Sequence, residues 1–436
     1  MSDFLLILYP ISIVIILMFR AEIKSKGRYY DDAWSLDQSK ALQAVAALMV
    51  ILHHIVQSIT DYGWTKKGPI TIWNSFGILF TSIFFFFSGF GLYKSYKTKE
   101  RYLDGFLKKR LPNILIPFMI ANIFYLIFDS KGRVYELRHV FTSIFGFTLL
   151  NKNAWFVVEL MVLYLAFYIC MKKSSTERAA LIKLTVFSLL LVFFSLLLGH
   201  DKSVINGHWF MGEWWYNTTM LFILGMFVAK KEEKIKQIMV KWYRILLIVS
   251  VSVLWGWFVL EENVLERFGY YREWENHPGY AEKFYTLIMQ VVLCVIFMFF
   301  ILLLNLKIEF KNRVLKFLGG ISFEVYLIHD IFRWLLLKSE KNGMSDALYI
   351  GLTFVLSIAA ACIFSMVDKY LLDFYKRYPS IIYSFRRPKF DDDTPIQIRK
   401  DVLKKRVIVS VVKMLYIIAF IGVLVTEGIT MCKCFK

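Results

Sequence analysis

Two adjacent histidines within an apolar stretch could supply acid–base chemistry inside a membrane. Residues 40–59 read KALQAVAALMVILHHIVQSI, with Lys40 and Gln43 near one end. On a helix, the eleven-residue step from Gln43 to His54 is almost three whole turns, which places both side chains on one stripe roughly 16 Å apart. His53 is rotated about 100° from that stripe. Because an ionisable group inside a bilayer is costly, we expect His54 to face a protein interior or a wet cavity.

Two further ionisable groups are expected at the depth of His54. Counted at about 1.5 Å per residue from the loop edges, His54, Glu159 and His329 each lie roughly 20 Å from the cytoplasmic edge of a hydrocarbon core about 30 Å thick. A histidine with a carboxylate partner could remove a proton from a hydroxyl. The same side chains could instead be separate polar contacts between helices. The catalytic candidates are therefore His54 first, then Glu159, His53 and His329.

A glycine-containing turn followed by a basic cluster is a candidate phosphate-binding site. Ser88 opens the sequence SGFG near the cytoplasmic edge, and the chain continues to Lys108, Lys109 and Arg110. Glycine permits close approach of the backbone, and the arginine fork suits phosphate geometry. The usual excess of Lys and Arg in cytoplasmic loops explains the basic residues equally well.

The composition indicates a polytopic membrane protein. Of the 436 residues, 58% are hydrophobic and 18% are aromatic, which a soluble domain does not show. The formal net charge of +19 could suggest a nucleic-acid partner, but the basic residues lie in loops between apolar segments. Five cysteines are too few for a disulfide framework, and no metal-ligand spacing is present. Cys432 and Cys434, near the end of the chain, could oxidise or bind a metal.

Twelve apolar segments are predicted to span the membrane, most of them with the roughly 17–25 residues that a span needs. They are residues 4–19, 40–59, 70–93, 111–128, 154–171, 180–198, 214–229, 242–260, 284–306, 315–338, 347–370 and 407–431. The predicted fold is an all-α transmembrane bundle. The first segment is expected to be an uncleaved helix, because no positive charge precedes it.

The Lys and Arg residues alternate between the loops on the two sides. One set of loops holds 37 of them and the opposite set holds 14. Because positive residues favour the cytoplasm, the first set is predicted to be cytoplasmic and both termini extracytoplasmic.

Four stretches resemble the acyltransferase-3 family of bacterial integral membrane O-acyltransferases, whose members acylate extracytoplasmic glycans. In order, they are LQAVAALMVILHH (42–54), FFFFSGFGLYKSY followed by KKRLPNILIPF (84–118), AWFVVELMVLY (154–164) and LGGISFEVYLIHDIF (318–332). The resemblance implies a ten-helix core over residues 36–370 and the plasma membrane of a bacterial cell as the expected location. Outside this core lie an extra helix and loop (1–35), a charged linker (371–406) and a C-terminal extra helix (407–436).

The resemblance also implies residue roles. His54 takes the position of the family's histidine, whereas Gln43 stands where the family usually has an arginine, and Lys40 one turn earlier is a candidate for the missing charge. His53 is the rival base. The implied donor is acyl-CoA, usually acetyl-CoA, presented from the cytoplasm with its phosphates on Arg110 and its neighbours. No permanently bound cofactor or metal is implied.

The implied partner is an extracytoplasmic glycan or a lipid-linked sugar, and nothing in the sequence sets the oligomeric state. The chief alternative is a permease or export component that moves a sugar, an acyl donor or an amino acid without chemistry, because twelve spans and intramembrane charges suit it too. Many transporters show a two-fold repeat, which this sequence lacks. A sensor or scaffold with structural histidines is a third possibility.

Overall fold

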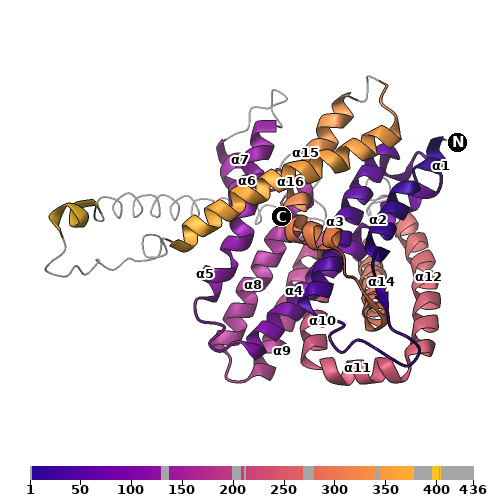
Figure 1. Ribbon diagram of the computed structural model, residues 1–436, viewed down its shortest axis with the longest axis horizontal. Helices are drawn as coiled ribbons and strands as arrows, with labels where there is room; N and C mark the ends of the chain where they lie inside the picture. The colour runs from indigo at the N-terminus through magenta and orange to yellow at the C-terminus, as the bar shows by residue number, and fades with distance from the viewer. Residues whose placement is uncertain are drawn as a thin grey trace.

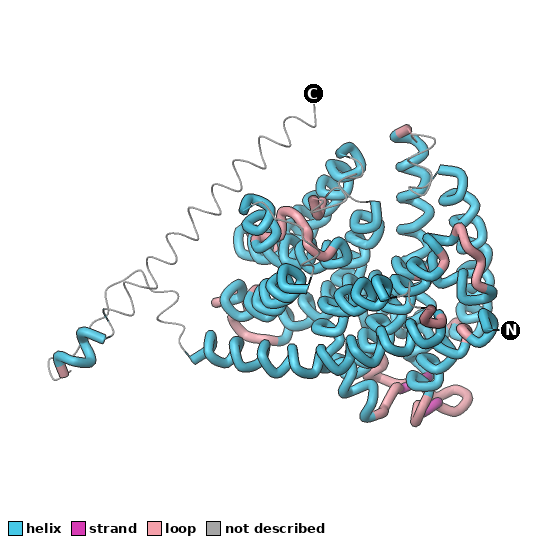
Figure 2. Tube along the Cα trace, turned by 90° about the horizontal axis from the view of Figure 1, so that it is seen from above, coloured by secondary structure: helices cyan, strands magenta, loops and turns pink. Residues whose placement is uncertain are grey.

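The computed structural model describes residues 2–128, 137–198, 208–210, 213–268, 279–339, 343–377, 395–401 and 403. Helices account for nearly all of the described chain and form one bundle (Figure 1). Figure 2 shows the two short strands at one edge of this bundle. The prediction of an all-α polytopic membrane protein is confirmed.

The elements follow one another along the chain. The first half comprises α1 (Ser2–Leu5), α2 (Leu8–Met18), β1 (Glu22–Ile23), α3 (Leu36–Ile59), η1 (Asp61–Gly63), η2 (Gly68–Ser75), α4 (Gly77–Thr98), α5 (Phe106–Arg110), α6 (Pro112–Phe128), α7 (Leu137–Ile144), η3 (Lys152–Ala154), α8 (Trp155–Lys173) and α9 (Glu177–Leu198). The second half comprises α10 (Glu213–Lys230), α11 (Glu232–Lys241), α12 (Tyr243–Phe268), α14 (Tyr280–Lys307), β2 (Ile308–Glu309), α15 (Arg313–Ser339) and α16 (Asp346–Arg377).

Most predicted spans coincide with single helices, but 4–19 is divided between α1 and α2, and 70–93 begins in η2 before α4 starts. The last span, residues 407–431, and the cysteines that follow lie outside the described residues. Within the described chain, seven helices are long and apolar enough to cross a membrane, namely α3, α4, α8, α9, α12, α14 and α16. Shorter apolar helices form at α2, α6 and α10. Long α15 carries three charged side chains, at Glu324, Asp330 and Arg333, inside its apolar stretch. These charges mark it as a helix that faces the protein interior.

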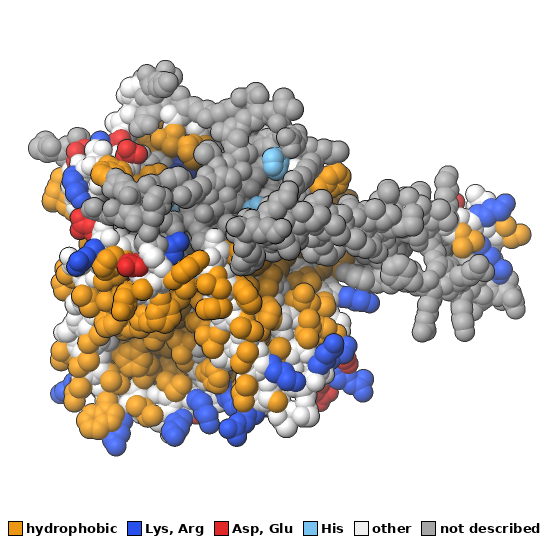
Figure 3. Space-filling view, turned by 180° about the vertical axis from the view of Figure 1, so that it is seen from behind, with side chains coloured by type: hydrophobic (Ala, Val, Ile, Leu, Met, Phe, Trp, Pro, Cys, Tyr) orange, Lys and Arg blue, Asp and Glu red, His pale blue; other side chains and the backbone are white. Residues whose placement is uncertain are grey.

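Five of the six loops predicted to be cytoplasmic meet at one end of the bundle. Strand β1 pairs with β2, which joins the loops around residues 20–40 and 307–316. Glu177 binds Lys97 at 2.9 Å and Lys230 at 2.7 Å, and so links three more of these loops. In Figure 3, Lys and Arg gather along the lower edge of a broad hydrophobic band. We call this end of the bundle the basic end.

Helix α11 lies across the basic end (Figure 1) and is tied to the bundle by its first residue. The Glu232 carboxylate binds Lys94 of α4 at 2.8 Å and Lys236 at 2.7 Å. Burial alone would raise the pKa of Glu232, but the hydrogen bonds from Lys236 and Lys94 outweigh it and lower the pKa below its usual value. The carboxylate is therefore charged at neutral pH and anchors α11 to α4.

Two glycines let α4 and α10 pack backbone to backbone. A Cβ atom at Gly89 would overlap the carbonyl oxygen of Phe222, and a Cβ atom at Gly225 would overlap the carbonyl oxygen of Phe86. The two contacts are reciprocal, because each helix places a glycine against the other's backbone. Only glycine fits such an approach.

We expect Gly89→Ala to destabilise the protein by about 1–3 kcal/mol, the usual cost of overpacking a core. Its methyl group would meet backbone, which cannot move aside as a side chain can. Gly91→Ala on the same helix is the matched control, since nothing lies within 4 Å of a Cβ atom there. Thermal unfolding of both variants in detergent checks the prediction, and equal midpoints would contradict it.

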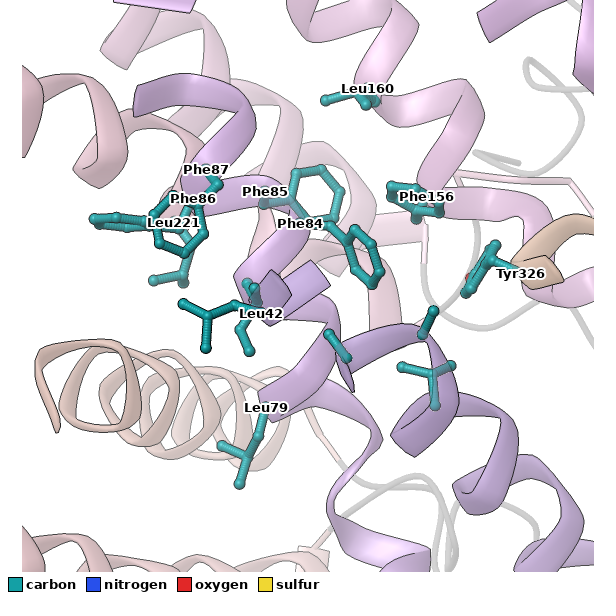
Figure 4. Packing of buried hydrophobic residues seen from close by; sticks show 14 of the residues in the cluster. Leu42, Leu79, Phe84, Phe85, Phe86, Phe87, Phe156, Leu160, Leu221 and Tyr326 are labelled. Atoms are coloured by element: carbon teal, nitrogen blue, oxygen red, sulfur yellow. The ribbon is translucent and has the colours of Figure 1, made fainter. Parts of the chain in front are cut away.

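The middle of α4 is an aromatic layer. Phe84, Phe85, Phe86 and Phe87 are buried and pack with residues of neighbouring helices such as Phe156, Leu160 and Leu221 (Figure 4). The ring of Phe156 lies 4.9 Å from that of Tyr326, between centroids. We call Phe84, Phe85, Phe86 and Phe87 the phenylalanine layer. Along α4 it separates the helix start at Gly77 from Ser88 and the basic end.

Helices α3 and α15 pack closely along their length and so determine where their histidines meet. A Cβ atom at Gly319 would lie 2.9 Å from the carbonyl oxygen of Lys40, which is tighter than ordinary contact. The glycine therefore allows α15 to approach α3 near its start. Further along the same two helices, His54 of α3 and His329 of α15 lie next to each other.

Candidate active site

His54 and His329 form a buried pair. His54 Nδ1 lies 2.8 Å from His329 Nε2, and the two rings are nearly parallel, with 5.1 Å between centroids. The depth calculated from the sequence predicted that these two residues lie at one level, and the structure confirms it for this pair.

The hydrogen bonds assign the tautomers of the neutral pair. His329 Nδ1 lies 2.6 Å from the carbonyl oxygen of Tyr326. A carbonyl only accepts, so Nδ1 of His329 carries the proton and Nε2 is the acceptor. His54 Nδ1–H must then donate to His329 Nε2, which leaves the lone pair of His54 on its own Nε2. This is the arrangement that a general base requires.

His54 lies on the wall of a cavity of about 480 Å³. His329 is not part of that wall and lies behind the His54 ring. The other polar and aromatic residues of the wall include Gln57, Tyr62, Tyr125, Lys152, Asn153, Trp155, Asn217, Gln290, Tyr326 and Trp334. Their positions at the end of α3 and the starts of α4 and α8 place the cavity at the end of the bundle opposite the basic end.

An ion pair on α15 flanks the histidines. Arg333 Nε donates to the Asp330 carboxylate, and Trp334 Nε1 donates to the other Asp330 oxygen at 3.1 Å. Arg333 Nη1 also donates to Ser58 Oγ at 2.6 Å, so the pair ties α15 to α3. Asp330 and Arg333 both line the cavity. They were not among the predicted site residues, although a charged pair three residues apart in an apolar helix is a visible signal.

His53 is a second base candidate on the same cavity wall. Its Nδ1 lies 2.9 Å from the carbonyl oxygen of Trp73, so its Nε2 also bears a lone pair. The ring packs against Gly77, where a Cβ atom would lie 2.5 Å from Nε2. His53 thus differs from His54 in the partner of its Nδ1 atom, which is a backbone carbonyl in His53 and a second histidine in His54.

Glu159 does not lie beside the histidine pair. Its side chain is fully buried on α8 and accepts a hydrogen bond from the Thr219 hydroxyl of α10. It is not part of the cavity wall, and its described hydrogen bond is not to a histidine. The structure therefore brings His54 and His329 together without Glu159, whose catalytic role stays a prediction.

The predicted donor-binding residues fall into two groups at the basic end. Arg110 Nε donates to the Tyr102 hydroxyl at 3.1 Å, and Tyr164 of α8 lies close to both Arg110 and Ser88. Lys108 and Lys109 are exposed on α5. The structure thus brings Ser88 and Arg110 together through two tyrosines that the sequence did not single out. Their part in binding a donor stays a prediction.

The remaining two predicted residues lie on α3, far from the cavity. Lys40 is exposed at the basic end, and Gln43 is half-buried one turn further along. Within the described residues, no cluster of three or more His, Cys, Asp or Glu side chains could hold a metal ion.

Comparison with known proteins identifies the family. A protein-family model described as an acyltransferase domain, that of the acyltransferase-3 family, matches residues 36–366. Comparisons with curated proteins and with solved structures find no match. The matched region contains both histidines, the cavity and the cluster around Arg110, and it covers most of the chain. The chain therefore belongs to the acyltransferase-3 family and is a membrane acyltransferase.

Proposed function

We propose that the protein transfers an acyl group, in the simplest case acetyl, from acyl-CoA at a cytoplasmic basic end to a hydroxyl of an extracytoplasmic cell-envelope glycan. The membrane would be the bacterial plasma membrane. The observation that carries the proposal is the lone pair of His54 Nε2 on the wall of a cavity at the opposite end. A base in that place is suited to deprotonating an acceptor that arrives from outside.

In the proposed reaction His54 acts first as base and then as acid. Its Nε2 takes the proton of the acceptor hydroxyl while the hydroxyl oxygen bonds to the acyl carbon. The carbon–sulfur bond of the thioester then breaks, and the CoA sulfur leaves with the proton that His54 returns. His329 Nε2 accepts from His54 Nδ1–H throughout, which supports the imidazolium formed in between. A relayed acyl transfer would use the same base.

The donor would bind through its phosphates at the basic end. Arg110 offers the bidentate geometry that phosphate prefers, with Tyr102 and Tyr164 beside it. From there the acyl arm would run past the phenylalanine layer toward His54. Apolar and aromatic side chains suit a thin, uncharged pantetheine chain better than they suit phosphate.

The acceptor would occupy the cavity itself. Trp155 and Trp334 on its wall offer flat apolar faces, and Gln57 and Asn153 offer amide groups. This mixture suits a sugar ring, which has apolar faces and a polar rim of hydroxyls.

Purified protein in lipid vesicles should move radiolabelled acetyl from acetyl-CoA onto an envelope oligosaccharide fraction, forming a base-labile ester. Vesicles without oligosaccharide control for hydrolysis, and vesicles without protein control for spontaneous transfer. Labelled but chemically unchanged acetyl-CoA or sugar accumulating in the vesicle lumen would instead support the permease alternative. Failure to consume acetyl-CoA or longer acyl-CoA with any acceptor would overturn the proposal.

A further inference from the structure

A second buried polar cluster borders the cavity, on helices other than those that carry the histidines. Asn217 of α10 and Gln290 of α14 both line the cavity, with exposed fractions of 3% and 5%. Asn217 Nδ2 donates to Gln290 Oε1, which joins the two helices. Glu261 of α12 lies beside Gln290 and is 1% exposed.

One oxygen of this cluster has no hydrogen-bond partner. Among the described residues, none bonds to Asn217 Oδ1. The Glu261 carboxylate lies within hydrogen-bond reach of the Gln290 side chain and is not part of the cavity wall. Leaving buried polar atoms unpaired is costly, and each such group in a native protein calls for an explanation. Asn217 Oδ1 is such a group on a residue of the cavity wall. A ligand that donates a hydrogen bond to this oxygen would offset the cost.

The chemistry of the unpaired amide oxygen identifies the kind of ligand. An amide oxygen only accepts hydrogen bonds, so the ligand must donate one to Asn217 Oδ1. Phosphate groups of a CoA donor are themselves acceptors and would meet like groups here. The hydroxyl groups of a sugar are donors, and one of them could donate to Asn217 Oδ1.

We propose that Asn217 and Gln290, backed by Glu261, form the subsite that binds hydroxyl groups of the acceptor and so selects the hydroxyl that reaches His54. This inference rests on the proposed acyl transfer and adds the residues that set its regioselectivity. The histidine pair supplies the base on α3 and α15, whereas the subsite orients the acceptor from α10, α12 and α14.

Asn217→Leu and Gln290→Leu remove the polar groups at nearly constant volume. Methyl glucoside and its monodeoxy analogues serve as probe acceptors with the purified full-length protein. For the variants, KM for methyl glucoside should rise about tenfold or more, because a site built to hydrogen-bond a hydroxyl depends strongly on that bond. KM for acetyl-CoA should not change. The wild type should discriminate against the analogue that lacks the bound hydroxyl, and the variants should not.

Asn305→Leu is the matched control. Asn305 is another buried amide on α14 with both side-chain atoms unpaired among the described residues, but it lies about 22 Å along the helix from Gln290. Its replacement should leave KM for methyl glucoside at the wild-type value. Glu261→Gln, which keeps shape and adds a donor, should also raise that KM and guards against misfolding of the leucine variants.

The outcomes separate this inference from the proposed function. Unchanged KM and unchanged discrimination in all three subsite variants would overturn the subsite while leaving acyl transfer intact. If the wild type transfers no acyl group, the binding of methyl glucoside followed by tryptophan fluorescence tests the subsite directly. Equal affinity of wild type and variants in that measurement would overturn it as well.

Discussion

His54→Ala is expected to lower acyl transfer by about 10²–10⁴-fold, the usual contribution of a general base. The variant loses the Nε2 lone pair of the one cavity-wall histidine that is hydrogen-bonded to a second histidine. Donor affinity should hold, because Arg110 lies at the opposite end of the bundle. Acyl ester formation, acetyl-CoA binding and thermal stability, each measured on purified protein, check the three parts of this expectation.

His53→Ala is the matched control for this prediction. Its ring lies on the same cavity wall, 5.2 Å from that of His54 between centroids, but it has no histidine behind it. We expect a much smaller loss of rate. An active His54→Ala protein would refute the mechanism, and an inactive His53→Ala protein beside it would move the base by one residue.

His329→Leu is expected to lower kcat by about 10–100-fold while KM for both substrates stays near the wild-type value. His329 is a positioning residue, since it lies behind His54 and away from the cavity. Without its Nε2, the Nδ1 proton of His54 has no acceptor and the ring can present either tautomer. The separation of kcat from KM distinguishes this role from a general loss of folding.

A conservative variant sharpens the second prediction. In His329→Gln, the amide oxygen can lie near the former position of Nε2 and accept from His54 Nδ1–H. This variant should recover part of the rate that His329→Leu loses, with the same thermal stability. If both variants retain full kcat, His329 serves packing alone; if both fail equally despite stable folding, the tautomer argument is wrong.

Depth could be predicted from the sequence because it needs only helical rise and hydropathy. Counting residues placed His54, Glu159 and His329 at one level, and two of the three do meet. Counting gives no information on which side of a helix faces which neighbour. Glu159, counted to the same depth, instead bonds to Thr219 on a helix that the calculation had not considered.

The residues that the sequence did not reveal are those that carry no unusual chemistry. Asn217 and Gln290 are ordinary amides more than 70 positions apart, and only the packing of α10 against α14 joins them. Tyr102 and Tyr164 are two of 24 tyrosines, and nothing in the sequence marks them as neighbours of Arg110. By contrast, the fold class could be predicted from the sequence, since long apolar segments and charged loops are local properties of the chain.

The phenylalanine layer bears on how well the protein resists the passage of ions through the membrane. A protein that binds a donor from one side of a membrane and an acceptor from the other needs a path between the two sides. Such a path could also let ions leak down their gradient across the membrane. Phe84 to Phe87 contribute four buried side chains to the level between the cavity and the basic end, and such side chains can neither relay a proton nor replace the hydration shell of an ion. We therefore expect this level of the protein to oppose the passage of ions while the proposed acyl arm, which is uncharged, runs past it.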